Sequence, residues 1–132
     1  MTAEARTPLE PLTPLAVETR LRRLVTELTT AQAVLRTARD AEVDARHEYD
    51  AARRRALLSD KSPKVTRGGY TVAEQAAWVD EQCAALRFAA DKATVGREAA
   101  QDRLRVLLAQ GEIVRSLGAS VRQAYEMAGT TG

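Results

Sequence analysis

The fold of this chain is decided by residues 72–128, VAEQAAWVDEQCAALRFAADKATVGREAAQDRLRVLLAQGEIVRSLGASVRQAYEMA. Small or apolar residues recur there at alternating steps of four and three for about eight heptads, and only Arg97 among them is charged. A spacing that averages about 3.5 residues is typical of a coiled-coil seam. The stretch therefore predicts a long helix that packs against a partner. Its seam comprises Val72, Ala76, Val79, Cys83, Leu86, Ala90, Ala93, Arg97, Ala100, Leu104, Leu107, Gly111, Val114, Gly118, Val121, Tyr125 and Ala128.

Residues 14–58 carry a second seam with the same spacing and supply the partner helix. Thr13 followed by Pro14 suits a helix start, because the threonine hydroxyl can accept a backbone N–H bond and proline is tolerated at the first helical position. Alanine is frequent on one side of the seam, which predicts closely spaced helix axes. The seam comprises Val17, Leu21, Leu24, Leu28, Ala31, Leu35, Ala38, Glu42, Ala45, Tyr49, Ala52 and Ala56.

A loop is predicted between the helices at residues 59–70, SDKSPKVTRGGY, where a proline and a glycine pair break the helical pattern. Thr71 and Glu74 then form a capping-box pattern at the start of a second helix over 71–128. Residues 1–13 are rich in proline and are expected to form an irregular arm. The chain is therefore predicted to be all-α, with its two long helices in an antiparallel coiled-coil hairpin.

The hairpin over residues 14–128 permits a pairing in which the facing seam residues are apolar. Placing Leu58 opposite Val72 brings Ala45 opposite Leu86, for example. We expect this pairing to set the alignment of the two helices.

Two charged seam residues, Glu42 and Arg97, lie one heptad out of line in that pairing. They can pair diagonally through the long arginine stem, or each can extend its head group into solvent. A polar seam residue often fixes the register of a coiled coil at some cost in stability.

The second helix has a further apolar row beside its seam, interrupted by Lys92. Seam and row together are as wide as the buried face of a bundle helix, so two hairpins are expected to form a four-helix homodimer. The second helix is also longer than the first and overhangs it at the C-terminal end. The candidate residues for an oligomer or partner interface are Trp78, Ala85, Ala99, Val106, Ile113, Val121 and Tyr125.

No group of residues in the sequence indicates catalysis. The sole histidine, His47, falls opposite the first seam, and the sole cysteine, Cys83, falls on the second seam. The sequence therefore offers no nucleophile–base pair and no zinc-ligand spacing. The pair Gly68-Gly69 lacks the preceding strand and the Lys-Ser/Thr signature of a phosphate-binding loop. We expect a protein that is not an enzyme and that takes no metal, cofactor or small-molecule substrate.

Positive charge is concentrated at the end of the first helix and in the loop. Residues 53–67 hold six basic side chains and one acidic side chain, whereas the whole chain has a formal charge of +2. Such a segment can contact nucleic-acid phosphates, and Tyr70 beside it can stack on an exposed base. The alternative is that the arginines only solubilise the helix end and complement its dipole. The candidate residues for binding nucleic acid or an acidic partner are Arg53, Arg54, Arg55, Lys61, Lys64, Arg67 and Tyr70.

Three stretches resemble a group of small helical-hairpin proteins encoded by phages and prophages of Gram-positive bacteria, particularly actinobacterial ones. These stretches are ARHEYDAARRRALLSD at 45–60, KVTRGGYTVAEQAAWVDEQCAALRFAAD at 64–91 and GEIVRSLGASVRQAYE at 111–126. In such proteins a Tyr/Ala-rich helix end precedes a polar loop and a Thr-capped helix. That helix finishes in an Arg-Ser…Arg segment, here Arg115, Ser116 and Arg122.

The resemblance implies an accessory role in phage DNA replication or recombination, such as loading or regulating a recombinase or a single-strand-binding protein. An inhibitor of a host or defence protein fits a small early phage protein equally well. The N-terminal sequence MTAEARTPLEPLTPL lacks the apolar core of a signal peptide, and no stretch approaches the ~18 apolar residues that span a bilayer. We therefore expect a protein of the bacterial host cytoplasm that binds DNA, a DNA-bound protein or a host protein, and no membrane.

Overall fold

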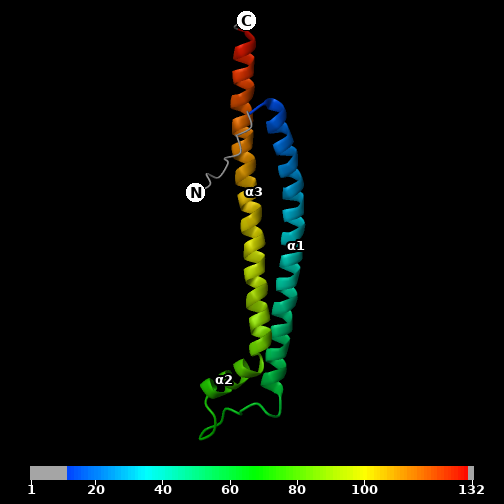
Figure 1. The fold of residues 1–132 in the computed structure, drawn as a ribbon. Coiled ribbons are helices and arrows are strands. Elements are labelled where there is room, and N and C mark those ends of the chain that lie inside the picture. The colour runs from blue at the N-terminus through cyan, green and yellow to red at the C-terminus, as the bar shows by residue number, and fades with distance from the viewer. Residues whose placement is uncertain (1–11, 131–132) are drawn as a thin grey trace, which may run out of the picture. The chain divides into compact units, whose positions relative to one another are not determined.

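Helices make up most of the part of the chain that the computed structural model describes, residues 12–130. Helix α1 spans Pro14–Leu58, α2 spans Val72–Gln82 and α3 spans Ala84–Thr130 (Figure 1). No strand is present between residues 12 and 130. The prediction of an all-α fold is therefore confirmed.

The described chain divides into two compact units. The first unit contains the described residues up to Thr30 together with those from Arg105 onward, and the second unit is Ala31–Leu104. Helices α1 and α3 each contribute to both units. The irregular arm predicted over residues 1–13 falls mainly on residues 1–11, which lie outside the described part.

Threonine caps begin α1 and α2, as the sequence predicts. The hydroxyl oxygen of Thr13 accepts the backbone N–H of Ala16 at 3.1 Å, and that of Thr71 accepts the N–H of Glu74 at 3.2 Å. Each bond satisfies a backbone donor that the first turn of a helix leaves without a partner. Pro14 follows its cap at the first helical position, where the missing N–H costs nothing.

Both predicted seams hold the helices together through most of their length. Every predicted seam residue of α1 is buried or half-buried, and so are those of α3 from Leu86 to Val121. The first unit has branched side chains in its core, whereas the second unit has several alanines. The buried hydrophobic residues of the first unit are Val17, Leu24, Leu107 and Val114, and those of the second unit are Ala31, Leu35, Val79, Cys83, Ala90 and Ala100.

Gly118 permits a close approach of α1 and α3 in the first unit. A Cβ atom at this position would lie only 2.9 Å from Cγ1 of Val17, so a larger residue would require the Val17 side chain or the helix backbone to shift. Helix α3 runs through both Gly111 and Gly118 without a break. Gly118 therefore serves the packing of the helices and does not end or interrupt α3.

The alignment of α1 with the second helix differs from the predicted pairing. Nε of Arg97 lies 3.2 Å from a carboxylate oxygen of Glu42, and Nη2 of Arg46 donates to Oγ1 of Thr94 at 2.7 Å. The predicted pairing of Ala45 with Leu86 is therefore wrong, because residues near Ala45 meet residues about one heptad further along the chain. This shift unites the two charges that the apolar pairing would have separated.

The second helix is not continuous as predicted. It ends at Gln82 and restarts as α3 at Ala84, with Cys83 between them at φ −103° and ψ 8°. Since Glu42 faces Arg97, the end of α1 at Leu58 faces roughly residue 81, and a straight helix would carry α2 beyond α1. The bend instead turns α2 sideways beside the loop (Figure 1) and buries Cys83.

Because of the bend, the positions predicted for three residues at the start of the second helix, Val72, Ala76 and Trp78, are wrong. Val72 and Ala76 are exposed and do not belong to the seam. Trp78 is half-buried on α2 and is not in line with Ala85 on α3, so it leaves the predicted apolar row. The side-chain amide of Gln75 donates to the backbone oxygen of Pro63 at 3.1 Å and ties α2 to the loop.

Replacing Leu107 with alanine is expected to destabilise the protein by about 2–5 kcal/mol, because a buried leucine leaves a cavity in the core. Leu107 is 1% exposed, whereas its neighbour Leu108 is 54% exposed and serves as the matched control. Leu108→Ala is expected to change the free energy of unfolding by less than about 0.5 kcal/mol. Urea unfolding followed by circular dichroism measures both, and equal losses would contradict the assigned packing of α3.

Candidate functional site

The loop between α1 and α2 is folded into a tight turn. The backbone N–H of Gly69 donates to the carbonyl oxygen of Thr66 at 3.0 Å, which closes a four-residue turn. Gly68, the third residue of that turn, has φ +85°, a value that residues with a Cβ rarely adopt. The turn places Arg67 at its corner. An isolated β-bridge between Val65 and Tyr70 brackets the turn.

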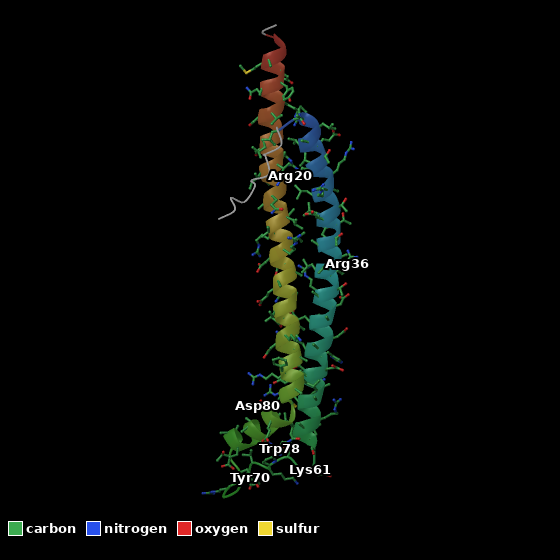
Figure 2. The ribbon with its side chains drawn as sticks, viewed as in Figure 1. Arg20, Arg36, Lys61, Tyr70, Trp78 and Asp80 are labelled. Carbon is green, nitrogen blue, oxygen red and sulfur yellow. The ribbon has the colours of Figure 1, made fainter. Side chains whose placement is uncertain are left out.

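The predicted basic residues lie at one end of the second unit, and all of them are exposed. Within the described residues 12–130, none of these basic side chains forms an ion pair. Tyr70 is 54% exposed and lies at the same end as Lys61 (Figure 2). The six basic side chains are Arg53, Arg54 and Arg55 at the end of α1, and Lys61, Lys64 and Arg67 in the loop.

Helix α2 brings negative charge to the same end of the second unit. It contains three carboxylates, Glu74, Asp80 and Glu81, and no basic residue. Figure 2 shows Asp80 on α2, near the end of the unit that carries the loop. The positive potential of the loop is therefore partly offset by the carboxylates of α2.

Arg53 lines a polar cleft of about 380 Å³ that the sequence analysis did not predict. Helix α1 contributes Arg46 and Tyr49 besides Arg53, while α2 contributes Asp80 and α3 contributes Arg87, Ala90 and Asp91. Three guanidinium groups and a phenol can bind an oxyanion such as a phosphate, although the two carboxylates oppose it. The side chains that line the cleft offer hydrogen-bond donors and positive charge to an anion.

Arg46 and Arg87 are the residues that sequence reasoning missed. Arg46, Tyr49 and Arg53 recur at helical spacing on one face of α1, and that signal is present in the sequence. The sequence did not predict that Arg87 lies close to Arg53, because the predicted alignment places Arg53 near Trp78 instead.

The proposed interface residues have mixed locations. Ala85 and Ala99 are exposed on α3, as are Val106 and Ile113, which are 50% and 61% exposed. In the first unit, Val121 is half-buried in the seam, whereas Tyr125 is 53% exposed. Ala85 and Ala99 therefore remain candidate contact residues of the second unit, as Val106 and Ile113 do of the first unit, whereas Trp78 lies apart from them on α2.

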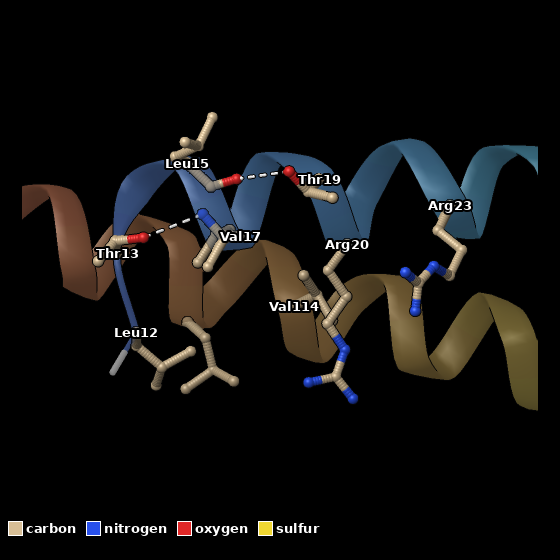
Figure 3. Close-up of a pocket in the computed structure, with 10 residues that line it drawn as sticks. Leu12, Thr13, Leu15, Val17, Thr19, Arg20, Arg23 and Val114 are labelled. Atoms are coloured by element: carbon tan, nitrogen blue, oxygen red, sulfur yellow. Dashed lines mark hydrogen bonds between the residues drawn. The ribbon is translucent and has the colours of Figure 1, made fainter. Parts of the chain in front are cut away.

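A second hollow, mainly apolar and about 760 Å³ in volume, lies in the first unit at the start of α1. Leu12, Leu15 and Val17 line it together with Val114 and Leu117 of α3. Figure 3 shows Arg20 and Arg23 extending from α1 beside it. The residues that line the hollow include no carboxylate, histidine or cysteine.

The described part of the chain contains no group of three or more His, Cys, Asp or Glu side chains that could hold a metal ion. His47 is exposed on α1, and Cys83 is a buried free thiol. Among residues 12–130, no helix is long and apolar enough to cross a membrane.

Comparison with known proteins assigns no family to this chain. No protein-family model, no curated protein and no solved structure matches it.

The best-defined charge interaction in the second unit involves Glu42. Burial raises the pKa of its carboxyl group, but hydrogen bonds from Thr94 and Arg97 outweigh that effect, and the charges of Arg97 and Arg46 add to them. The pKa of Glu42 therefore lies below its ordinary value of 4.5. Arg97 also donates to Oε1 of Gln101 at 3.0 Å, which orients the guanidinium group.

A Glu42→Gln variant is expected to lose part of the acid sensitivity of the fold. A carboxyl group whose folded pKa is depressed stabilises the protein above its unfolded pKa, and this contribution disappears as the pH falls through the folded value. Between about pH 6 and pH 3, the free energy of unfolding should therefore decrease less steeply for the variant than for the wild type. Urea titrations across this range measure the slopes, and identical slopes would contradict the ionised Glu42–Arg97 pair.

Proposed function

We propose that this chain is a non-enzymatic helical binding module that contacts nucleic acid, or a nucleoprotein, through the end of the second unit that carries its loop. The observation that carries the proposal is the exposure of six basic side chains, none of them in an ion pair within residues 12–130. Exposed lysines and arginines bind phosphates by releasing counterions, with little dependence on sequence.

The local geometry supports phosphate binding at two adjoining places. Arg67 extends from a turn whose backbone is held by a hydrogen bond, and Lys64 lies two residues before that turn, so the loop presents charge from a defined scaffold. Arg53 connects the end of α1 to the cleft that Arg46 and Arg87 also line. The carboxylates of α2 would limit the affinity and favour a contact restricted to the loop and the cleft.

The resemblance to small phage and prophage proteins gives this binding a biological setting. An accessory protein of phage DNA replication or recombination would act in the bacterial cytoplasm, where Cys83 would remain a free thiol. Contact with a strand that a recombinase or single-strand-binding protein already covers requires only a short basic surface.

We also propose a finer description of the fold. Helices α1 and α3 form an antiparallel coiled-coil hairpin, with α2 as a side helix at its loop end, and two such hairpins associate as a homodimer. Support comes from the paired seams and from exposed apolar residues on α3, which a second chain would cover.

An alternative function is favoured by those same apolar residues. Val106, Ile113 and Tyr125 are at least half exposed, which suits an adaptor or inhibitor that binds a host or defence protein. In that case a nuclease-treated pull-down from the host would recover one dominant partner, and Ile113→Asp or Tyr125→Asp would abolish its recovery. Recovery that is unaffected by both substitutions would exclude this alternative.

The nucleic-acid proposal predicts a salt-sensitive interaction that depends on the loop. Changing Lys61, Lys64 and Arg67 together to alanine removes three phosphate contacts and should reduce the slope of log K against log salt by about 2–3 units. Fluorescence anisotropy with labelled single-stranded and duplex oligonucleotides, between 50 and 200 mM salt, measures this slope.

The matched control removes the same charge elsewhere in the second unit. Arg36, Arg39 and Arg103 are exposed arginines outside the loop and the cleft, and none of them forms an ion pair in the described part of the chain. Their triple alanine variant should retain most of the binding. The proposal is wrong if the control loses as much affinity as the loop variant, or if the wild type does not bind at 50 mM salt.

A further inference from the structure

Helix α3 carries an apolar row on the side turned away from α1. The row advances by steps of three and four residues, the same spacing as the seam, and its members are exposed while the seam residues between them are buried or half-buried. Phe88 is 69% exposed and Val95 is 63% exposed. Within the second unit, this α3 row comprises Ala85, Phe88, Lys92, Val95, Ala99 and Asp102.

The two charged members of the α3 row are placed symmetrically. Lys92 and Asp102 lie equally far from a midpoint that also lies halfway between Val95 and Ala99. Two copies of α3 that run in opposite directions about this midpoint bring each Lys92 against the partner's Asp102. Val95 then meets the partner's Ala99.

Other alignments of two α3 rows leave the charges unmatched. A parallel arrangement places lysine against lysine and aspartate against aspartate, which is repulsive. Sliding an antiparallel pair by one heptad places Lys92 against the partner's Val95 and Asp102 against the partner's Ala85. A Lys92 ammonium group placed against an apolar side chain with no carboxylate opposite it is costly, so these alternatives are disfavoured.

We propose that two copies of this chain pair through their α3 rows in opposite directions, with Lys92 of each copy bound to Asp102 of the other. This inference rests on the proposed homodimer and specifies its surface and its register. Asp102 also has an interaction within its own chain, and a carboxylate can accept several hydrogen bonds at once. The occupant of the exposed row is thus a second copy of the chain.

The arrangement has a consequence for nucleic-acid binding. α3 begins at Ala84, about 20 Å along the helix from the midpoint of the row, so the two starts of α3 lie about 40 Å apart. Each start adjoins one basic loop through α2. A dimer would therefore carry two loops that face separate sites, and linked binding of this kind raises the apparent affinity without new contacts.

A zero-length carbodiimide crosslink tests the contact directly. The reagent joins a lysine to a carboxylate only when the two touch, and Lys92 and Asp102 of one chain are about 15 Å apart along the helix. Equal amounts of ¹⁴N- and ¹⁵N-labelled chains are mixed and crosslinked, and the peptides are identified by mass spectrometry. We expect a mixed-isotope Lys92–Asp102 crosslink in the wild type and none in Lys92→Arg, which keeps the charge.

Charge reversal provides the second measurement. Lys92→Asp or Asp102→Lys alone should weaken dimerisation by more than about tenfold in sedimentation equilibrium, because each places like charges together. The double variant should restore the wild-type dissociation constant to within about threefold. Glu98→Lys and Arg103→Asp, at exposed positions of α3 outside the row, are matched controls that should leave it unchanged.

The outcomes separate this inference from the functions proposed above. A wild type that stays monomeric at 100 µM overturns both the homodimer and this register. A dimer without the mixed crosslink, or without rescue by the double variant, overturns the register alone. Oligonucleotide binding by the loop is measured independently, so its presence or absence does not bear on either conclusion.

Discussion

The ion pair between Glu42 and Arg97 is the interaction on which the rest of the second unit depends. An apolar seam alone can be aligned in several ways, one heptad apart, with little difference in buried area. A half-buried glutamate and arginine favour one of these alignments. Each loses hydrogen bonds to water, and the other residue must replace them. The observed alignment unites them at 3.2 Å, with Arg46, Thr94 and Gln101 completing the surrounding hydrogen bonds.

The shape of the basic end follows from that alignment. Shifting α1 by about one heptad leaves the first residues of the second helix with no partner on α1. The helix bends at Cys83, so α2 packs beside the loop. There the side-chain amide of Gln75 donates a hydrogen bond to the backbone oxygen of Pro63. The same bend brings Asp80 near Arg53 and Arg87 and thereby creates the polar cleft. One seam contact therefore has consequences for the charge of the candidate binding surface.

Much of the secondary structure could be predicted from local signals. The cap at Thr13, the cap at Thr71 and the loop with Gly68 each depend on short-range chemistry, and the structure places them as expected. The alignment and the bend could not be predicted in this way. Both depend on comparing whole alignments, and matched apolar residues alone do not reveal the cost of moving two charges out of line.

The residues of the candidate site also differ in whether local sequence signals could predict them. The exposure of Arg53, Lys61 and Arg67 follows from their place in a polar segment, so sequence reasoning reached them. Arg46 and Arg87 join the site only through the tertiary alignment. Trp78 was assigned to an α3 row by periodicity, yet one residue with ψ near 8° at Cys83 removes it from that row. Periodicity is reliable only while the helix is continuous.

The most direct test of this account is a charge-reversal cycle at the seam. Glu42→Arg and Arg97→Glu are made singly and together, and the urea midpoint of each variant is measured at neutral pH. If the pair sets the alignment, each single variant lowers the midpoint and the double variant regains most of the loss, as expected for residues in direct contact. Losses that simply add in the double variant would show that the two residues do not face each other, and the account would be wrong.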